Sequence, residues 1–366
     1  MSTDGSSLIP RPGILDISPY VGGESEIEGR RDIIKLSSNE GAFGPSPKAM
    51  AAFEKASGEL HRYPDGTCET LRKALGKHHG LDPVRIVCGA GSDELIGLLC
   101  RAYAGSGDEI LYSQHGFLMY PIAAKACGAT PVMAPETDLK ADVDALLARV
   151  TKKTRILFLA NPNNPTGSYL STEEVQRLRD GLPASVLLVI DAAYAEYMTR
   201  NDYSSGAELV DSAVNTVMAR TFSKVYGLGG LRLGWAYCPP DVADVLNRVR
   251  NPFNVSGPAQ AAGLAALDDI AFIDRSIAHN EIWRAWLADQ LRGLGLTVPD
   301  GVGNFVLARF PDEAGRDAAA ADGFMKERGI IVRRVAGYGL PDCLRITVGN
   351  ESEMRAVVAA LKDFTG

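Results

Sequence analysis

A lysine in a glycine-rich segment, Lys224 of TFSKVYGLGGLRLG (221–234), has neighbours that can bind a phosphate. Arg232 lies eight residues further on, and Thr221 and Ser223 supply hydroxyl groups. An arginine fork and hydroxyl donors can together ligate a phosphate dianion, which leaves the lysine amine free to meet a carbonyl carbon. Most lysines that follow strands are solvated, so this prediction depends on the other motifs of the chain.

A second candidate phosphate seat is GAGSDE (89–94), which lies between an apolar segment and a predicted helix. Free N–H groups and the positive end of the helix dipole attract an anion there, and Ser92 adds a hydroxyl. Alternatively, Ser92, Asp93 and Glu94 form only a helix cap with an acidic first turn. The motif lacks the lysine of a P-loop, which argues against a nucleoside triphosphate.

Asp191 ends the apolar segment SVLLVID (185–191). A carboxylate in this place is exposed at the sheet edge, caps a helix or pairs with a buried cation. A pyridinium nitrogen is such a cation, and an aspartate partner keeps it protonated. Tyr194, and Asn164 of NPNNPTG (161–167), could bond the phenolic oxygen of the same ring, although NPNNPTG is also an ordinary turn sequence. Together with Lys224, these motifs predict a pyridoxal-phosphate site.

Each of these motifs follows a predicted strand, and helices alternate with the strands. The segments 85–89, 155–160 and 185–191 are continuous apolar runs of the kind found in parallel sheets. The alternation predicts a doubly wound α/β sheet, which binds ligands at the carboxyl ends of its strands. After about residue 250 a long helix precedes shorter strands and a final helix, which indicates a smaller α+β domain.

The predicted organisation is therefore an N-terminal arm over residues 1–35, a large cofactor-binding domain over 36–250 and a small domain over 251–366. Part of the N-terminal segment is expected to join the small domain. Because proline, glycine and serine are frequent in the arm, it is not expected to fold by itself.

Composition and charge exclude several other classes of protein. The chain has 366 residues and a net charge of −7, which argues against non-specific binding to nucleic acid or to an anionic membrane. The six cysteines are spread singly and the five histidines lack ligand spacing, so reduced thiols and no metal site are expected. No signal peptide and no apolar run of about 20 residues is present, so we expect a cytoplasmic protein.

Nearly the whole chain resembles the fold-type I pyridoxal-phosphate aminotransferases, and more narrowly the histidinol-phosphate aminotransferases. The resemblance is carried by the motifs above and by four further segments: PYVGG (19–23), SSNEGAFGPSP (37–47), RYPDG (62–66) and GYGLPDCLRITVG (337–349). It implies an aspartate-aminotransferase-like fold, with a mostly parallel sheet in the large domain and a smaller α+β domain.

The resemblance also assigns roles to residues around pyridoxal 5'-phosphate. Lys224 would carry the cofactor as a Schiff base and then move the substrate proton, while Asp191 pairs with the ring nitrogen. Phe117 stands where many relatives have a stacking tyrosine, and stacking needs only the ring face. Tyr63 would reach the cofactor phosphate of the other subunit of a homodimer. The remaining cofactor ligands implied are Ser92, Asp93, Asn164, Tyr194, Thr221, Ser223 and Arg232.

On the substrate side, Arg345 matches the distal arginine of the family, which binds a carboxylate in general transaminases. Histidinol phosphate has no carboxylate, so there the arginine would contact the phosphate, joined by Tyr20 and Arg333 with Asn39 close by. Arginine suits either anion. Neighbouring residues of a strand point to opposite faces, so only one of Arg333 and Arg334 can face the pocket.

The activity implied is transamination from L-histidinol phosphate to 2-oxoglutarate, giving imidazole-acetol phosphate and glutamate in histidine biosynthesis. One alternative is an aromatic aminotransferase acting on phenylalanine or tyrosine. Another is a lyase similar to the threonine-phosphate decarboxylases, which share these motifs. A regulator with an aminotransferase-like domain is disfavoured, because the chain has no basic extension that could bind DNA.

Overall fold

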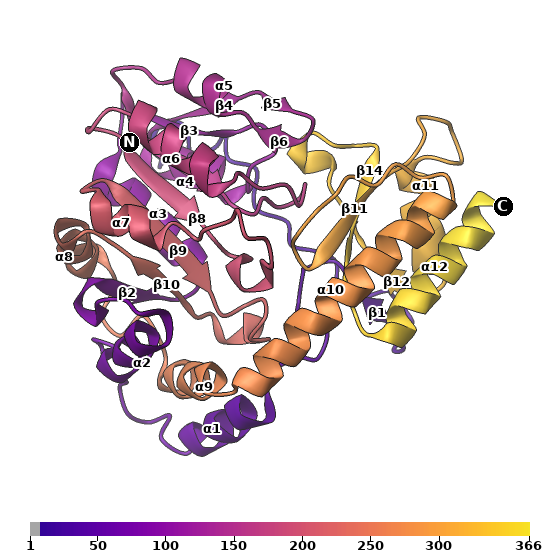
Figure 1. The fold of residues 1–366 in the computed structure, drawn as a ribbon, viewed down its shortest axis with the longest axis horizontal. Coiled ribbons are helices and arrows are strands. Elements are labelled where there is room, and N and C mark those ends of the chain that lie inside the picture. Colours follow the sequence, from indigo (N-terminus) through magenta and orange to yellow (C-terminus); the bar gives the residue numbers. More distant parts are fainter. Residues whose placement is uncertain (1–7) are drawn as a thin grey trace, which may run out of the picture.

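A seven-stranded sheet forms the centre of the larger domain in the computed structural model, which describes residues 8–366 (Figure 1). The strand order is β2-β10-β9-β8-β7-β3-β4. Strand β10 runs antiparallel to both of its neighbours, and all other neighbouring pairs are parallel. The predicted mostly parallel α/β fold is therefore confirmed. The strands are β2 (Ile86–Gly89), β3 (Glu109–Ser113), β4 (Thr130–Ala134), β7 (Thr154–Ala160), β8 (Leu187–Asp191), β9 (Thr216–Thr221) and β10 (Gly234–Tyr237).

Helices cover both faces of this sheet, and each face has its own apolar core. The core on one face includes Leu95 and Leu246, and the helices there are α3 (Ser92–Tyr103), α4 (Met119–Cys127) and α8 (Pro240–Val249). The core on the other face includes Leu71 and Leu178. Its helices are α2 (Glu69–His79), α5 (Val143–Ala148), α6 (Thr172–Gly181), α7 (Ala207–Ser212) and α9 (Gly257–Leu267). Burial on both faces explains why these strands read as continuous apolar runs.

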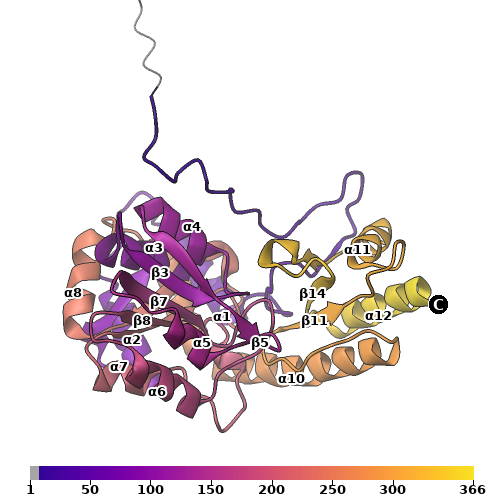
Figure 2. The ribbon, with the colours of Figure 1, turned by 90° about the horizontal axis from the view of Figure 1, so that it is seen from above.

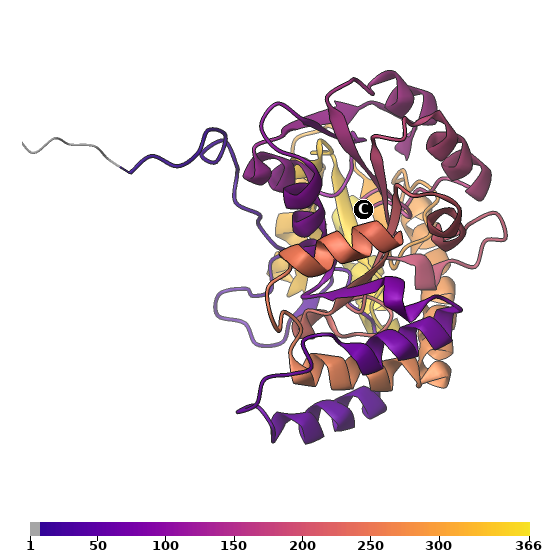
Figure 3. The ribbon, with the colours of Figure 1, turned by 90° about the vertical axis from the view of Figure 1, so that its left-hand side faces the viewer.

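Local signals in the sequence mark where helices begin. Helix α6 begins with a capping box, in which Ser171 and Glu174 each bond the other's backbone N–H. Helix α1 (Pro47–Ser57) begins with Ser46 as its cap and proline in the first turn. Helices α1 and α9 pack side by side, although they are far apart in the sequence (Figure 3).

The smaller domain surrounds an antiparallel sheet with the order β11-β14-β13. Its elements are β11 (Phe305–Arg309), β13 (Arg333–Arg334), β14 (Cys343–Thr347), α11 (Ala318–Glu327) and α12 (Glu351–Thr365). The long helix α10 (Ile270–Gly293) runs from the larger domain to the smaller one (Figure 1). Ile273, near its start, belongs to the core of the large domain, whereas Leu287 and Leu291 belong to that of the small domain.

The N-terminal segment enters the small domain through β1 (Ile34–Lys35), which pairs in parallel with β12 (Ile330–Ile331). Leu36 follows and is buried in the small domain's core. Before β1, the described part of the segment runs along the outside of the molecule (Figure 2). Residues 1–7 of the predicted arm lie outside the described residues. Helix α9 lies after the predicted boundary at residue 250 yet packs on α1 and α2, and the exact domain bounds stay a prediction.

The remaining strands, β5 (Glu136–Thr137) and β6 (Lys140–Ala141), form a small hairpin. Within residues 8–366, no helix is long and apolar enough to cross a membrane. The same residues contain no cluster of histidine, cysteine, aspartate and glutamate that could hold a metal ion.

Candidate active site

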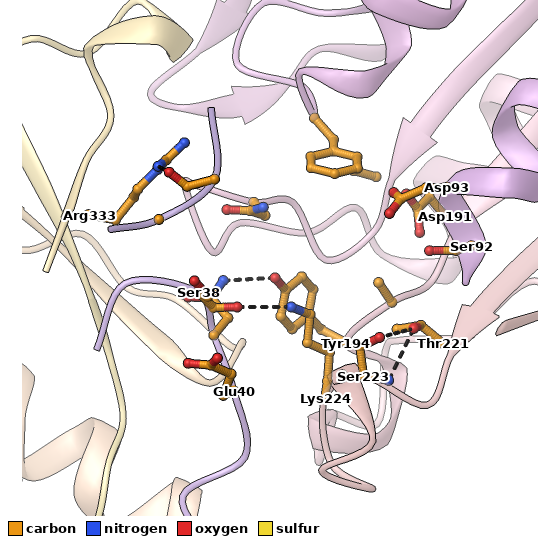
Figure 4. Close-up of a pocket in the computed structure, with 18 of the residues that line it drawn as sticks. Ser38, Glu40, Ser92, Asp93, Asp191, Tyr194, Thr221, Ser223, Lys224 and Arg333 are labelled. Carbon is orange, nitrogen blue, oxygen red and sulfur yellow. Dashed lines mark hydrogen bonds between the residues drawn. The ribbon is translucent and has the colours of Figure 1, made fainter. Parts of the chain in front are cut away.

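A cavity of about 310 Å³ lies where the carboxyl ends of the large sheet's parallel strands meet the small domain. Strands β2, β3, β7, β8 and β9 all end at this edge, so the motifs that follow them converge. Every predicted site residue except Tyr63 lines the cavity (Figure 4). These residues are Tyr20, Asn39, Ser92, Asp93, Phe117, Asn164, Asp191, Tyr194, Thr221, Ser223, Lys224, Arg232, Arg333 and Arg345.

Lys224 follows strand β9 and brings its amine into the cavity. The Nζ donates to the carbonyl of Ser38 at 3.2 Å and lies 5.6 Å from the centre of the Tyr194 ring. Burial, and secondly the charge of Arg345, lower the pKa of Lys224 to about 8. At neutral pH a larger fraction of the amine is therefore in the reactive neutral form than in an ordinary lysine.

The N-terminus of helix α3 and the β9–β10 loop form a seat for an anion. Ser92 is the first residue of α3, so nearby backbone N–H groups lack helical partners. Thr221 Oγ1 donates to Ser223 Oγ at 2.9 Å, and Arg232 contacts the same Ser223 oxygen at 3.5 Å. An N-terminal helix dipole, three hydroxyls and a guanidinium together suit a phosphate dianion.

Asp93, unlike the other residues of the seat, has a side chain that pairs with Arg232. Its carboxylate accepts from Arg232 Nη2 at 3.0 Å. A carboxylate repels a phosphate, so the Asp93 side chain orients Arg232, and only its backbone N–H can serve the phosphate. Gly91 makes this approach possible, because a Cβ there would lie 2.3 Å from Arg232 Nη2.

Asp191 ends strand β8 and is 5% exposed. Tyr120 Oη donates to its Oδ2 at 2.8 Å, whereas Oδ1 is buried and has no partner within residues 8–366. Burial raises the pKa of Asp191 to about 6, against the opposing effect of the Tyr120 bond. A protonated ring nitrogen would give Oδ1 its missing partner, so this residue fits the ring of pyridoxal phosphate.

Tyr120 contacts the candidate site through Asp191 and was not predicted from the sequence. It lies in helix α4, three residues after Phe117, and it is fully buried with its ring stacked on Phe158 at 4.7 Å. Phe117 precedes α4, and its ring meets the Tyr120 ring edge-on with centroids 5.9 Å apart. The nearness of Tyr120 to Phe117 in HGFLMY was the available signal. The distant contact with Asp191 could not be read from that spacing.

Tyr194 is held by the segment that follows β1. Its Oη accepts from Asn39 Nδ2 at 2.8 Å, and Asn39 Oδ1 accepts from Thr347 Oγ1 at 3.1 Å. Since the phenolic oxygen accepts this bond, its own hydrogen is free to donate to a ring oxygen. Asn39 was expected beside the substrate, and it lines the cavity but is 1% exposed and bonds Tyr194.

Two arginines of the small domain face the cavity from neighbouring strands. Arg333 on β13 lies directly opposite Arg345 on β14, whereas the adjacent Arg334 is exposed and points away. Arg333 therefore is the pocket residue of the pair. Like charges on directly opposed positions repel, so this arrangement suits an anion with more than one charge.

Both guanidiniums also hold neighbouring segments. Arg345 Nη2 donates to the Ser37 carbonyl at 2.6 Å, and Nη1 bonds the side-chain oxygen of Asn164. Arg333 Nη2 donates to the Val21 carbonyl at 2.7 Å. Nearby, the Tyr20 ring meets Phe117 edge-on, with centroids 6.3 Å apart. The segment around residues 20–22 thus closes one side of the cavity.

Tyr63 does not line the cavity of its own chain. It is 83% exposed and stacks on Phe253, with ring centroids 4.6 Å apart. A large exposed aromatic pair of this kind is available to another surface.

The fold and the cavity define a pyridoxal-phosphate-dependent enzyme of fold type I, in which a lysine after a central strand faces an aspartate for the ring nitrogen and a seat for the phosphate. Comparison with known proteins agrees: residues 31–361 match the family model for aminotransferase class I and II. The chain belongs to this family, and within it to the histidinol-phosphate aminotransferases.

The relatives are similar over almost the entire chain. A histidinol-phosphate aminotransferase of Paramagnetospirillum magneticum is 68% identical, with 98% of each chain covered. One from Rhodospirillum rubrum is 62% identical, covering 97% of this chain and 96% of its own. The crystal structure of the Sinorhizobium meliloti histidinol-phosphate aminotransferase with pyridoxal-5'-phosphate has a TM-score of 0.89 at 30% identity, with 98% of each chain covered.

Proposed function

We propose that the protein transfers the amino group of L-histidinol phosphate to 2-oxoglutarate, giving imidazole-acetol phosphate and glutamate in histidine biosynthesis. The observation that carries the substrate choice is the opposed pair Arg333 and Arg345 at the cavity wall. Two guanidinium forks can share the oxygens of one phosphate dianion, which a single carboxylate would not satisfy. The identity of the relatives supports the same substrate.

The chain's own residues account for holding the cofactor. Ser92, Thr221, Ser223 and Arg232 would bind its phosphate, with Asp93 orienting Arg232. Asp191 would hold the ring nitrogen, and Tyr194 and Asn164 would bond the ring hydroxyl. Phe117 would cover one face of the ring. Pyridoxal phosphate, when bound, supplies an electron-withdrawing ring that stabilises negative charge on the carbon bearing the amino group.

Lys224 is the group that moves the proton. Its lowered pKa would suit the neutral Lys224 amine to take a proton from the reacting carbon of the substrate and later to give a proton back. Tyr120 acts through Asp191: by donating to Oδ2 it favours the carboxylate form, which leaves Oδ1 for the ring nitrogen.

Two further features stay proposals of the same kind. Tyr63 is proposed to reach the cofactor phosphate of the partner in a homodimer, supported by its exposure and its distance from its own cavity. The cytoplasmic location expected from the sequence also stays a prediction.

A panel of amino donors tests the substrate, with 2-oxoglutarate as the acceptor and kcat/KM as the measure. L-histidinol phosphate should exceed phenylalanine and tyrosine, and Arg333→Gln should reduce kcat/KM for histidinol phosphate much more than for phenylalanine. Arg334→Gln is the matched control, because its side chain points away from the cavity. A preference for phenylalanine would establish the aromatic alternative, and release of carbon dioxide from threonine phosphate would establish the lyase.

A further inference from the structure

A second cavity, of about 220 Å³, lies at the junction of the two domains and has no part in the proposed reaction. Its walls are helix α10, segment 299–301 and strand β11 of the small domain, and Thr166 and Arg200 of the large domain. Phe305 joins its wall to the active site, since the ring packs edge-on against Tyr194 with centroids 5.3 Å apart.

Three arginines line this cavity, and among residues 8–366 only one of them forms ion pairs. Arg292 pairs with Asp289 at 3.2 Å and with Asp300 at 2.7 Å. Those two aspartates are the only acidic residues in the described lining, and each is committed to Arg292. Arg200 and Arg284 form no ion pair within residues 8–366, and the charges of Glu281 and Asp300 act on Arg284 only as lesser effects than burial and the charge of Arg200.

Arg284 is the more buried of these two arginines. Its Nη1 donates to the Gly301 carbonyl, whereas its Nε is buried and has no partner in the part of the chain described. Burial, and secondly the charge of Arg200, lower the pKa of Arg284. An unpaired buried N–H beside a second cation is costly, and an anion would relieve both penalties.

Arg200 approaches from the large domain. It has no ion pair or side-chain hydrogen bond to any residue from 8 to 366. Glu281, on the same face of α10, is bonded by Thr199 at 3.2 Å and forms no ion pair with either arginine. Arg200 is also exposed, so it can reach a ligand in the cavity without breaking an existing contact.

We propose that this cavity binds a phosphate dianion between Arg200 and Arg284, as inorganic phosphate or as the phosphate of a small monoester. Two guanidinium groups offer more donors than one carboxylate can accept, whereas a phosphate presents three oxygens and close to two charges. Because Arg200 belongs to the large domain and Arg284 to the small one, the bound anion joins the domains behind the active site.

The test is calorimetric titration of the cofactor-loaded enzyme, in which the cofactor's own phosphate occupies its seat. The Arg333→Gln background weakens phosphate binding in the substrate pocket. Inorganic phosphate and glycerol 3-phosphate are titrated separately, and dissociation constants on the order of a millimolar are expected. Tighter binding of glycerol 3-phosphate would identify a monoester as the ligand, tighter binding of inorganic phosphate would identify free phosphate, and equal binding would show that the cavity recognises the phosphate group alone.

Arg200→Gln and Arg284→Gln should each weaken this binding at least about tenfold, because each removes one charged fork. Arg248→Gln is the matched control, since Arg248 is exposed, paired with Asp244 and remote from both cavities. If Arg284→Gln does not fold, the phosphate affinity of Arg200→Gln still tests the proposal, because Arg200 is exposed. Unchanged affinity in Arg200→Gln, or no binding of either probe, would overturn the proposal without touching the proposed transamination.

Discussion

At the scale of single residues, the two carboxylate oxygens of Asp191 differ in their hydrogen bonding. Oδ2 is bonded by Tyr120 at 2.8 Å, and Oδ1 is left for the ring nitrogen. A carboxylate in so buried a place tends to take up a proton, and the Tyr120 bond opposes this tendency.

Replacing Tyr120 with phenylalanine should weaken cofactor binding. Loss of a hydrogen bond to a charged group costs about 1.5–3 kcal/mol, which corresponds to a roughly tenfold or greater rise in the Kd for pyridoxal phosphate. The pKa of Asp191, already raised to about 6, should rise further, so affinity should begin to fall at a higher pH as the solution is acidified. Fluorescence titration of the apoenzyme across pH measures both effects.

The control for this variant is Tyr112→Phe, which removes a hydroxyl from a neighbouring ring that has no bond to Asp191. A cofactor analogue that lacks the ring nitrogen cannot bond Asp191, so it shows whether the variant weakens this one contact or disturbs the folded protein. Its affinity should be the same in Tyr120→Phe and the parent, and an equal loss for both ligands would refute the role given to Tyr120.

At the scale of elements, the site depends on close approach between helix α3 and the β9–β10 loop. Gly91 caps α3 with φ of 84°, and the space beside it is taken by Arg232. A Cβ at Gly234 would similarly lie 2.5 Å from the Ser92 nitrogen. These glycines let two backbones approach one phosphate from both sides.

Gly91→Ala should therefore displace Arg232 from the seat. The left-handed backbone alone costs about 1–3 kcal/mol, and the clash adds to it. We expect a lower melting temperature and at least about tenfold weaker binding of pyridoxal phosphate, measured against Gly97→Ala, whose Cβ meets no atom. Pyridoxal, which lacks the phosphate, should differ far less in affinity between Gly91→Ala and Gly97→Ala. If Gly91→Ala weakened the binding of pyridoxal as much as that of pyridoxal phosphate, the result would argue against a phosphate site here.

Much of the element scale could be predicted from the sequence. The continuous apolar runs identified buried parallel strands, and the motifs after them converge because parallel strands end at one edge. The choice between Arg333 and Arg334 could not be made, since it depends on the register of β13 against β14. The contacts of Tyr120 with Asp191 and of Asn39 with Tyr194 depend on tertiary packing that no local pattern encodes.

At the scale of the whole molecule, the cavity is formed from both domains and from the N-terminal segment. Asn39 links them, bonding Tyr194 of the large domain and Thr347 of the small one. Tyr63, in contrast to the other predicted site residues, lies exposed outside the cavity. Completion by a partner chain is the simplest use of such a residue.

Mixing two inactive variants tests this completion. Tyr63→Ala and Lys224→Ala should each be nearly inactive alone, because one lacks a phosphate ligand and the other the reactive amine. If Tyr63 acts across the interface, hybrids should regain up to about a quarter of parental activity, since in a random mixture half of the dimers are hybrids with one intact site each. No recovery after verified subunit exchange would place Tyr63 outside the partner's site.

Chemical trapping decides whether Lys224 carries the cofactor. Borohydride reduces the carbon–nitrogen double bond that joins pyridoxal phosphate to an amine, and peptide mass spectrometry then locates the label. We predict that the label lies on Lys224, is absent in Lys224→Ala, and is prevented when L-histidinol phosphate is added before reduction. A label on another lysine, or one that survives in Lys224→Ala, would contradict the assignment.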